Sequence, residues 1–354
     1  MFSGDIQGVG PRYCPSIEDK VKRFPDRGRH QIFLEPEGLN TESIYPNGMS
    51  TSLPEESQLE FLRSIEGLEK VEILKPGYAV EYDSLDPTEL NPNLMSSHVE
   101  GLFFAGQVNR SSGYEEAAAQ GLWAGINAGR YLNGDLKGLR PDRSRSYMET
   151  LVEDLVFKGT KEPYRLFTSR SEYRLHLRED NAHDRMIDLG LSEGLLSPEY
   201  LEKKTQLDGK VKEIENTLKT KRKRVSKDRM ISLFELLKRP EENWEKISME
   251  EGLNFENALA VEKVEIQSKY SGYLGRIESE IKSLKKAKEL SIDYDRWNDC
   301  KLAGVSAEVR EKVLAERPEN IYELSRMSGV SSVDLLTISK SLGVKRERVS
   351  HETM

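Results

Sequence analysis

The stretch Gly101-Leu-Phe-Phe-Ala-Gly106-Gln107-Val-Asn109, followed by Gly113-Tyr114, decides the fold of the first part of this chain. Residues 101–104 are apolar enough for a buried strand, and residues 114–132 are expected to form one long helix. A strand, a glycine turn and a helix N-terminus together make a site for a phosphate or a polarised ring. We therefore expect a domain with strands and helices whose ligand-binding turn follows residue 104.

The expected helix carries small residues four apart on one face, namely Ala117, Gly121, Gly125 and Gly129. Glycine costs roughly 1 kcal/mol in a helix interior, so three on one stripe indicate that backbone or a cofactor approaches closely. Tight packing of the helix on a sheet, without a ligand, explains the stripe equally well. A dinucleotide fold should also open with G-x-G-x-x-G between a strand and a helix. The nearest approach, residues 8–13, lacks the third glycine and a preceding strand.

The rest of the first 140 residues alternates short apolar runs with turn signals. Asn47-Gly48 is a strong turn signal, and Ser52-Leu-Pro-Glu55 opens an expected helix. Strands are expected at residues 30–34, 71–74 and 78–82.

One of the two cysteines, Cys14, lies in a polar stretch just before another expected helix. Apolar residues recur from Ile17 at i, i+4 and i+7, the spacing of one helix face. This helix would place Cys14 at its N-cap, where the helix dipole, Arg12 and Lys20 would favour a thiolate. A small buried cysteine without chemistry is the alternative.

Composition limits the classes of protein that remain. The 354 residues are 32% charged with a net charge of −8, so any contact with phosphates must come from local patches. Cys14 and Cys300 lie far apart and indicate neither a disulfide framework nor a metal cluster. The N-terminus lacks a signal-peptide pattern, and no apolar run approaches the ~18 residues of a membrane span. We expect two or three domains, no metal, no membrane and a cytoplasmic location.

After residue 140 the chain becomes helical and highly charged. A long amphipathic helix is expected at residues 262–290, and three short helices at the end are marked by caps at Ser306, Asn320 and Ser331. Such a compact helical tail is typical of a protein-docking module.

Two basic segments stand out in this half. Arg170, Arg174 and Arg178 fall at i, i+4 and i+8 of an expected helix, with aromatic residues among them. Arginine with aromatics suits phosphate contact and base stacking, although nearby acidic residues also fit an ordinary salt-bridged surface helix. The second run, Lys219-Thr-Lys-Arg-Lys-Arg224, is either a solvated surface or a patch that steers a polyanion.

Several long segments together resemble the MnmG (GidA) family. The resemblance covers essentially all of the chain and rests on GPRYCPSIEDK, FLEPEG, IYPNGMSTSLP, LFFAGQ followed by GYEEAAAQG, GTKEPYRLFTSRSEYRLHLREDNA, YSGYLGR and LSRMSGVS. It implies an α/β fold, namely an incomplete FAD-binding Rossmann-like domain, followed by an all-α helical C-terminal domain. Residues 1–140 would be the C-terminal part of the FAD/NAD-binding domain, 141–269 a helical, charged region that contacts tRNA, and 270–354 a helical partner-docking domain.

The resemblance also implies an activity. The family binds FAD and modifies C5 of the wobble uridine (U34) of certain tRNAs, together with the GTPase MnmE. It adds an aminomethyl or carboxymethylaminomethyl group with carbon from 5,10-methylenetetrahydrofolate and with NADH as reductant, and the full-length family is expected to form homodimers.

The resemblance assigns roles to residues of this chain. It makes Cys14 the catalytic residue, and leaves open whether the thiol attacks the uridine or serves flavin or folate chemistry. It assigns tRNA contact to Arg165, Arg170, Arg174 and Arg178. It assigns cofactor binding to Gly10, Pro11, Arg12, Tyr13, Pro15, Ser16, Lys20 and Phe24 near the nicotinamide nucleotide, and to Gly106, Gln107, Asn109, Gly113 and Tyr114 near the flavin.

One departure from the family pattern indicates an alternative function for this chain. Family members carry an N-terminal half with the dinucleotide fingerprint, and this sequence has no counterpart of it. The resemblance therefore implies that residues 1–140 contribute only part of a sheet, with an exposed edge and exposed apolar surface. The alternative is therefore a truncated, non-catalytic module that binds tRNA or MnmE.

Overall fold

The computed structural model describes residues 16–80, 82–227, 229–288, 290–297, 302, 304–327, 329–331, 333–335, 337–338 and 345–346. The chain forms two compact units. The first unit comprises Met1–Pro141 and Thr150–Phe167, and the second comprises Asp142–Glu149 and Thr168–Met354. Cys14, its neighbours Gly10, Pro11, Arg12, Tyr13 and Pro15, and Cys300 lie outside the described residues.

The first unit begins with helix α1 (Ile17–Arg23), which confirms the helix expected after Cys14. Its N-cap is Ser16, whose Oγ accepts the Asp19 N–H at 3.2 Å. The expectation that Cys14 would be the N-cap was therefore wrong. A serine hydroxyl two residues later satisfies the free N–H groups of the first turn, which is the job of an N-cap.

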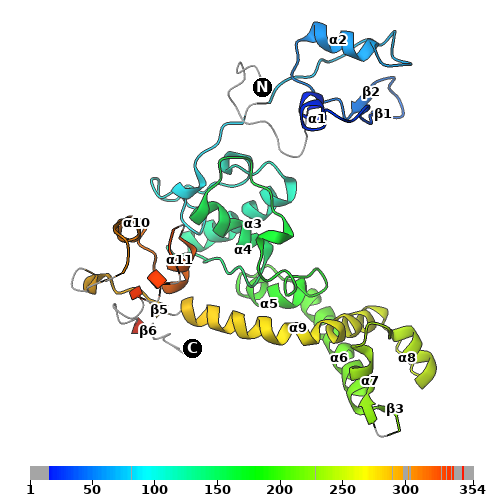
Figure 1. Cartoon of the computed structure of the whole chain (residues 1–354), viewed down its shortest axis with the longest axis vertical. Coiled ribbons are helices and arrows are strands. Elements are labelled where there is room, and N and C mark those ends of the chain that lie inside the picture. The colour runs from blue at the N-terminus through cyan, green and yellow to red at the C-terminus, as the bar shows by residue number, and fades with distance from the viewer. Residues whose placement is uncertain are drawn as a thin grey trace. The chain divides into compact units, whose positions relative to one another are not determined.

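Strands β1 (Phe33–Pro36) and β2 (Ile44–Asn47) follow and pair antiparallel, with Phe33 opposite Asn47. Helix α2 (Glu55–Arg63) begins where the Ser52–Glu55 signal predicted it. Figure 1 shows α1 beside the hairpin and α2 above it. The strand expected at 30–34 is thus confirmed only in part, because the ladder starts at Phe33.

The other expected strands do not form. Described residues in 71–74 and 78–82 have no strand, and residues 101–104 contribute one isolated bridge, from Phe103 to Met95. A strand is stable only when a neighbour completes its hydrogen-bond ladder, and these apolar runs find no such neighbour among the described residues. The 3₁₀ turns η1 (Pro87–Glu89) and η2 (Gly106–Asn109) follow these segments along the chain.

Helix α3 (Tyr114–Leu132) has the bounds that the sequence predicted. It buries Gln120, Trp123 and Asn127, and it lies close to the segment 150–167 through Ala119, which packs with Leu151, Leu155, Tyr164 and Leu166. A Cβ added to any of its three glycines would meet nothing within 4 Å. The glycine stripe therefore points away from the packed side of α3, and no described part of the chain packs against it.

The first unit leaves many large apolar side chains exposed, as expected for part of a sheet domain. Among the described residues these include Phe24, Phe33, Leu34, Ile44, Leu74, Tyr78, Leu122 and Leu132. The segment 154–158, labelled η3 (Asp154–Lys158), is a short π-helical continuation of α4 (Tyr147–Glu153).

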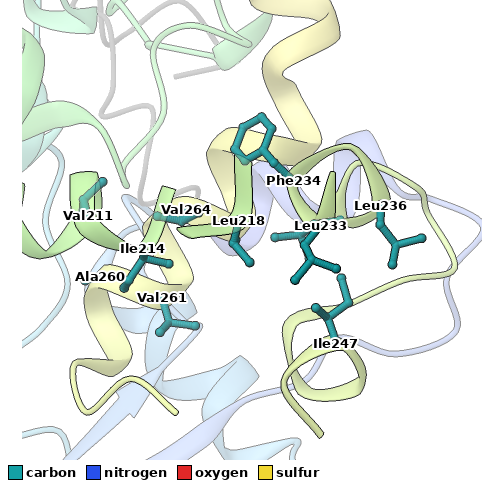
Figure 2. Close-up of a cluster of buried hydrophobic side chains, with 11 residues drawn as sticks. Val211, Ile214, Leu218, Leu233, Phe234, Leu236, Ile247, Ala260, Val261 and Val264 are labelled. Carbon is teal, nitrogen blue, oxygen red and sulfur yellow. The ribbon is translucent and has the colours of Figure 1, made fainter. Parts of the chain in front are cut away.

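The second unit is mainly helical and has an extended apolar core. Its first part contains α5 (Ala182–Ser192), α6 (Pro198–Thr220), the antiparallel hairpin β3 (Arg222–Ser226) and β4 (Arg229–Ser232), α7 (Leu233–Leu237), α8 (Trp244–Glu251) and α9 (Ala258–Lys288). Figure 2 shows how side chains of α6, α7, α8 and α9 meet, including Ile214, Leu218, Leu233, Ile247 and Val264. The helix α9 confirms the long helix expected at 262–290.

The end of the chain forms a second small core. Around it lie β5 (Leu290–Ser291), η5 (Tyr294–Arg296), α10 (Ala307–Glu316), α11 (Ile321–Arg326) and β6 (Lys345–Arg346). The three expected caps are confirmed: Ser306 accepts from the Val309 N–H, Asn320 from the Glu323 N–H and Ser331 from the Asp334 N–H. The expected fold class, an α/β part followed by a helical C-terminal part, is therefore confirmed. The sheets found among the described residues have two strands each.

Two findings concern the described residues as a whole. No helix there is long and apolar enough to cross a membrane. No group of three or more His, Cys, Asp or Glu there is arranged to hold a metal ion.

Candidate cofactor site and arginine segment

The predicted cofactor turn starts at a glycine that the backbone requires. Gly106 has φ +79°, and a Cβ added there would lie 3.4 Å from Cβ of Ala117. Its N–H donates to Oε1 of Gln120 at 2.9 Å. Positive φ and close approach to α3 both favour glycine, so the sequence-predicted role of Gly106 as a turn residue is confirmed, whereas its contact with a cofactor stays a prediction.

Gln120 organises the turn from inside α3. Its Oε1 also accepts from Nδ2 of Asn109 at 3.1 Å, and its Nε2 donates to Oγ of Ser111 at 2.5 Å. Gln120 and Asn109 are both fully buried. The sequence analysis did not single out Gln120, although it stands in the quoted GYEEAAAQG segment.

Arg110 builds the wall of a pocket beside this turn. It adopts the left-handed conformation (φ 53°), its Nε donates to the Leu85 carbonyl at 3.2 Å, and its Nη1 donates to the Thr160 carbonyl. Its own carbonyl accepts the Tyr164 N–H at 2.7 Å. Arg110 thus ties its own segment to two others, through partners 25 and 50 residues away from it in the chain. No local pattern could have revealed this, because every partner is distant in sequence.

These segments line a small pocket of about 80 Å³ that is partly open to solvent. Gln107 lines it, together with Tyr82, Ser84, Arg110, Ser111, Ser112, Lys161, Glu162 and Pro163. Gly113, which caps α3, is buried, and Tyr114 is almost fully exposed.

Two polar atoms of the loop are buried without a partner. Oδ1 of Asn109 and Oγ of Ser112 meet no hydrogen-bonding group in the described part of the chain. Leaving such a group unpaired costs about 1–3 kcal/mol. Ser112 therefore offers a free hydroxyl to a pocket that also carries the cations Arg110 and Lys161, whereas the fully buried Asn109 does not line this pocket.

The second group of predicted cofactor residues is held by other elements. Ser16 caps α1, and Nζ of Lys20 donates to the Gly48 carbonyl at 2.7 Å. Phe24 is half exposed, and Arg27 lies over its ring at 5.6 Å. The Ser16 hydroxyl thus bonds within the first turn of α1 and Lys20 is tied to the turn after β2, whereas Gly106 and Asn109 are held by Gln120 of α3.

The arginine segment does not form the helix that its spacing suggested. Residues 168–170 form the 3₁₀ turn η4 (Thr168–Arg170), and turns follow up to Leu177. Nη2 of the buried Arg143 donates to the Arg170 carbonyl at 2.6 Å, and the Ser171 hydroxyl accepts the Tyr173 N–H at 3.1 Å. Both contacts divert backbone groups from a helical ladder. The expectation of one arginine stripe was therefore wrong.

The four predicted RNA-contacting arginines have different surroundings. Arg165 belongs to the first unit and lies over the Phe167 ring at 5.0 Å. Arg178 pairs with Asp180 at 2.8 Å and lies over the Tyr270 ring at 4.5 Å. Arg170 and Arg174 are exposed. The structure thus commits Arg178 to intramolecular contacts and leaves the exposed side chains of Arg170 and Arg174 at the surface of the second unit.

A buried carboxylate lies near this segment in the second unit. Burial raises the pKa of Glu149 to about 7, although Arg145 donates two hydrogen bonds to its Oε1. Glu172 behaves in the opposite way, because hydrogen bonds from Arg143 outweigh its burial and lower its pKa.

Two parts of the chain match models of one protein family. Residues 1–135 match the family described as "Glucose inhibited division protein A", and residues 198–278 match "tRNA modifying enzyme MnmG/GidA C-terminal helical domain". Two crystal forms of Aquifex aeolicus GidA are similar in structure, at 43% identity over 94% of this chain. The TM-scores are 0.81 for form II and 0.79 for form I.

The chain belongs to the GidA (MnmG) family. It spans about half the length of the two solved relatives, 55% of one and 54% of the other.

Proposed function

We propose that this chain takes part in the flavin-dependent modification of tRNA. The reaction is the addition of an aminomethyl or carboxymethylaminomethyl group at C5 of the wobble uridine, with an MnmE-type GTPase as partner. The observation that carries the proposal is the pocket beside residues 106–113, in a chain 43% identical to GidA over 94% of its length. NADH and 5,10-methylenetetrahydrofolate are the proposed co-reactants, and the cytoplasm is the proposed location.

The residues of the pocket fit one end of a flavin. The free hydroxyl of Ser112 lines the pocket and suits the polar edge of a ring, and Gln107 adds an exposed amide. When bound, the flavin supplies the redox and one-carbon chemistry of the reaction. This chain's share is to orient the ring and to shield one side of it. The G-x-G-x-x-G motif, which binds the diphosphate of a dinucleotide between a strand and a helix, does not occur in this sequence.

Cys14 is the proposed catalytic thiol. C5 of uracil is a poor nucleophile. Addition of a thiolate to C6 converts the C5–C6 double bond into an enolate whose negative charge is shared by C5 and O4, and this makes C5 nucleophilic. The competing role, in which the thiol serves flavin or folate chemistry, predicts no covalent bond to RNA. Incubation with the co-reactants and a tRNA that carries 5-fluorouridine at position 34 separates the two roles. Once the new group has bonded to C5, the fluorine that replaces the C5 proton cannot leave, so the C6–sulfur bond persists as a protein–RNA band that Cys14→Ser lacks.

The proposal is tested by flavin and product together. The purified chain is titrated with FAD, and tRNA is then analysed for C5-modified uridine by mass spectrometry, with the GTPase and co-reactants present. Gln107→Ala should weaken flavin binding because Gln107 lines the pocket, whereas Lys210→Gln on the exposed side of α6 should not. Absence of both flavin binding and product in the unchanged chain would refute the proposal.

One observation favours a second candidate, a non-catalytic module that binds tRNA or the GTPase. The second unit contains two apolar cores of its own, around α6–α9 and around α10–α11. A chain that binds tRNA or the GTPase but retains no FAD at any concentration would select this candidate.

A further inference from the structure

The hairpin of β3 and β4 concentrates positive charge in an acidic protein. Residues 219–229 contain seven Lys or Arg and one Asp, whereas the whole chain has a net charge of −8. Figure 1 shows β3 at the C-terminal end of α6, beside α7. The charge is therefore local to one projecting element of the second unit.

Strand alternation divides these charges between two faces. Lys223 and Val225 are half-buried, and Val225 packs against the core cluster with Ile231. Nζ of Lys223 hydrogen-bonds to Glu250 and lies 3.5 Å from Glu251. The inward face is thus apolar and neutralised by the two acidic residues of α8.

The outward face keeps its charge. Arg222 and Arg224 are exposed on β3, and Lys227 and Arg229 are exposed near the turn. No carboxylate within the described ranges forms an ion pair with any of these four side chains. Like charges this close repel one another, and a bound polyanion would relieve the repulsion.

The face is held in place by the core beneath it. The Leu233 N–H donates to the Lys221 carbonyl at 2.9 Å, which closes the base of the hairpin, and Lys219 lies over the Phe234 ring at 5.3 Å. Residues two apart on a strand are about 6.6 Å from each other. Arg222 and Arg224 are therefore preorganised to reach two neighbouring phosphates.

We propose that the outward face of the β3–β4 hairpin binds the sugar–phosphate backbone of RNA. The inference rests on the proposed function, in which the substrate is a tRNA. Guanidinium groups form paired hydrogen bonds with phosphate oxygens. A membrane surface is less suitable, because stable anchoring needs an apolar contribution beside the basic residues. Met230 is the one large apolar side chain exposed on this hairpin among its described residues.

The test measures binding of the full chain to a fluorescent, unmodified tRNA transcript across a salt series. The variant Arg222→Gln/Arg224→Gln/Arg229→Gln removes three outward charges. The matched control, Lys203→Gln/Lys210→Gln/Lys212→Gln, removes three charges from exposed lysines on α6. We expect the hairpin variant to raise the Kd about tenfold or more near 0.1 M salt and to lower the log–log salt slope by about 2. The control should change the Kd less than about twofold, because it loses no phosphate contact.

Other results would contradict either the contact at the hairpin or the tRNA substrate itself. Equal weakening in both variants would mean a diffuse field and not a hairpin contact, and unchanged binding in the hairpin variant would remove the inference while leaving the proposed function intact. Failure of the unchanged chain to bind tRNA would overturn the proposed tRNA substrate as well. If the hairpin variant loses binding to vesicles of anionic phospholipid but not to tRNA, the face belongs to a membrane surface. Circular dichroism of both variants checks that the fold is retained.

Discussion

Residues 16–80 and the α6–α9 cluster stabilise themselves by opposite means. In the first region the buried side chains are mostly polar: Oε1 of Glu18 accepts from Thr51 and Ser52, and the amide of Gln58 exchanges hydrogen bonds with both backbone groups of Gly77. The α6–α9 cluster instead buries eleven side chains in one apolar core. The first region is therefore shaped by specific hydrogen bonds, whereas the α6–α9 cluster is stabilised by removing apolar area from water.

The largest expected effect is the loss of stability when a buried apolar side chain of the α6–α9 cluster is truncated, compared with an exposed one of the first region. Leu218 is 0% exposed in the α6–α9 cluster, whereas Phe33 of β1 is 54% exposed. Leu218→Ala should lower the free energy of unfolding of the second unit by about 2–5 kcal/mol, because it removes buried apolar area and leaves a cavity. Phe33→Ala should cost less than about 1 kcal/mol. Urea unfolding followed by circular dichroism measures both changes in the free energy of unfolding. Equal changes would contradict the view that the two regions are stabilised by different means.

The next effect is a pair of opposite pH dependences. The pKa of Glu149 in the second unit is about 7, above its ordinary 4.5, because the group is buried. From pH 4.5 to 7 the unfolded chain has lost this proton while the folded chain keeps it, so stability should fall as the pH rises, by up to roughly 3 kcal/mol in total.

Glu18 should behave in the opposite way. Burial would raise its pKa, but hydrogen bonds from the backbone, Ser52 and Thr51 outweigh burial and lower it below 4.5. Its contribution is present above pH 4.5 and is lost as the pH falls through the lowered pKa. Thermal melts from pH 3 to 8 should show both trends. Glu149→Gln should flatten the trend above pH 4.5, and the exposed Glu199→Gln should not.

A smaller effect concerns the polar centre of the first region. A Cβ at Gly77 would lie 2.9 Å from the Thr51 carbonyl oxygen, so Gly77→Ala must displace backbone. We expect a loss of about 1–2 kcal/mol that is confined to residues 50–80. Hydrogen exchange should speed up there and stay unchanged in α6 and α9. Gly67→Ala is not a suitable control, because its φ is +91°, whereas Gly28→Ala meets nothing within 4 Å and should be neutral.

The smallest effect compares two helix caps of the same chemistry. Ser197 caps α6 and Ser16 caps α1, each through its hydroxyl. Ser197→Ala should cost about 1 kcal/mol of global stability, because α6 is part of an apolar core. Ser16→Ala should melt only α1, which contains no buried residue. A global loss from Ser16→Ala that matches Ser197→Ala would show that α1 is coupled to the rest.

Local chemistry explains which elements could be predicted from sequence. Helix α3 and the caps at Ser306, Asn320 and Ser331 depend on hydrogen bonds between residues three or four apart, so their signals lie within one short window. The glycine at 106 was also predictable, because a turn that leads into a helix close to it restricts the side chain. The strands expected in 71–82 and at 101–104 were not formed, because a strand depends on a distant neighbour.

The sequence by itself determined the positions of helix ends, the glycine turn, the charge of the basic runs and the family. Only the tertiary structure decided what those residues face. Arg143 turned the expected arginine helix into turns from 27 residues away, and Arg110 built a pocket with a carbonyl 50 residues away. Strand alternation separated Lys223 from Arg222 and Arg224. The physical reason is range: caps and turns are decided between near neighbours in the chain, whereas burial, pairing and pocket walls depend on residues that only folding brings together.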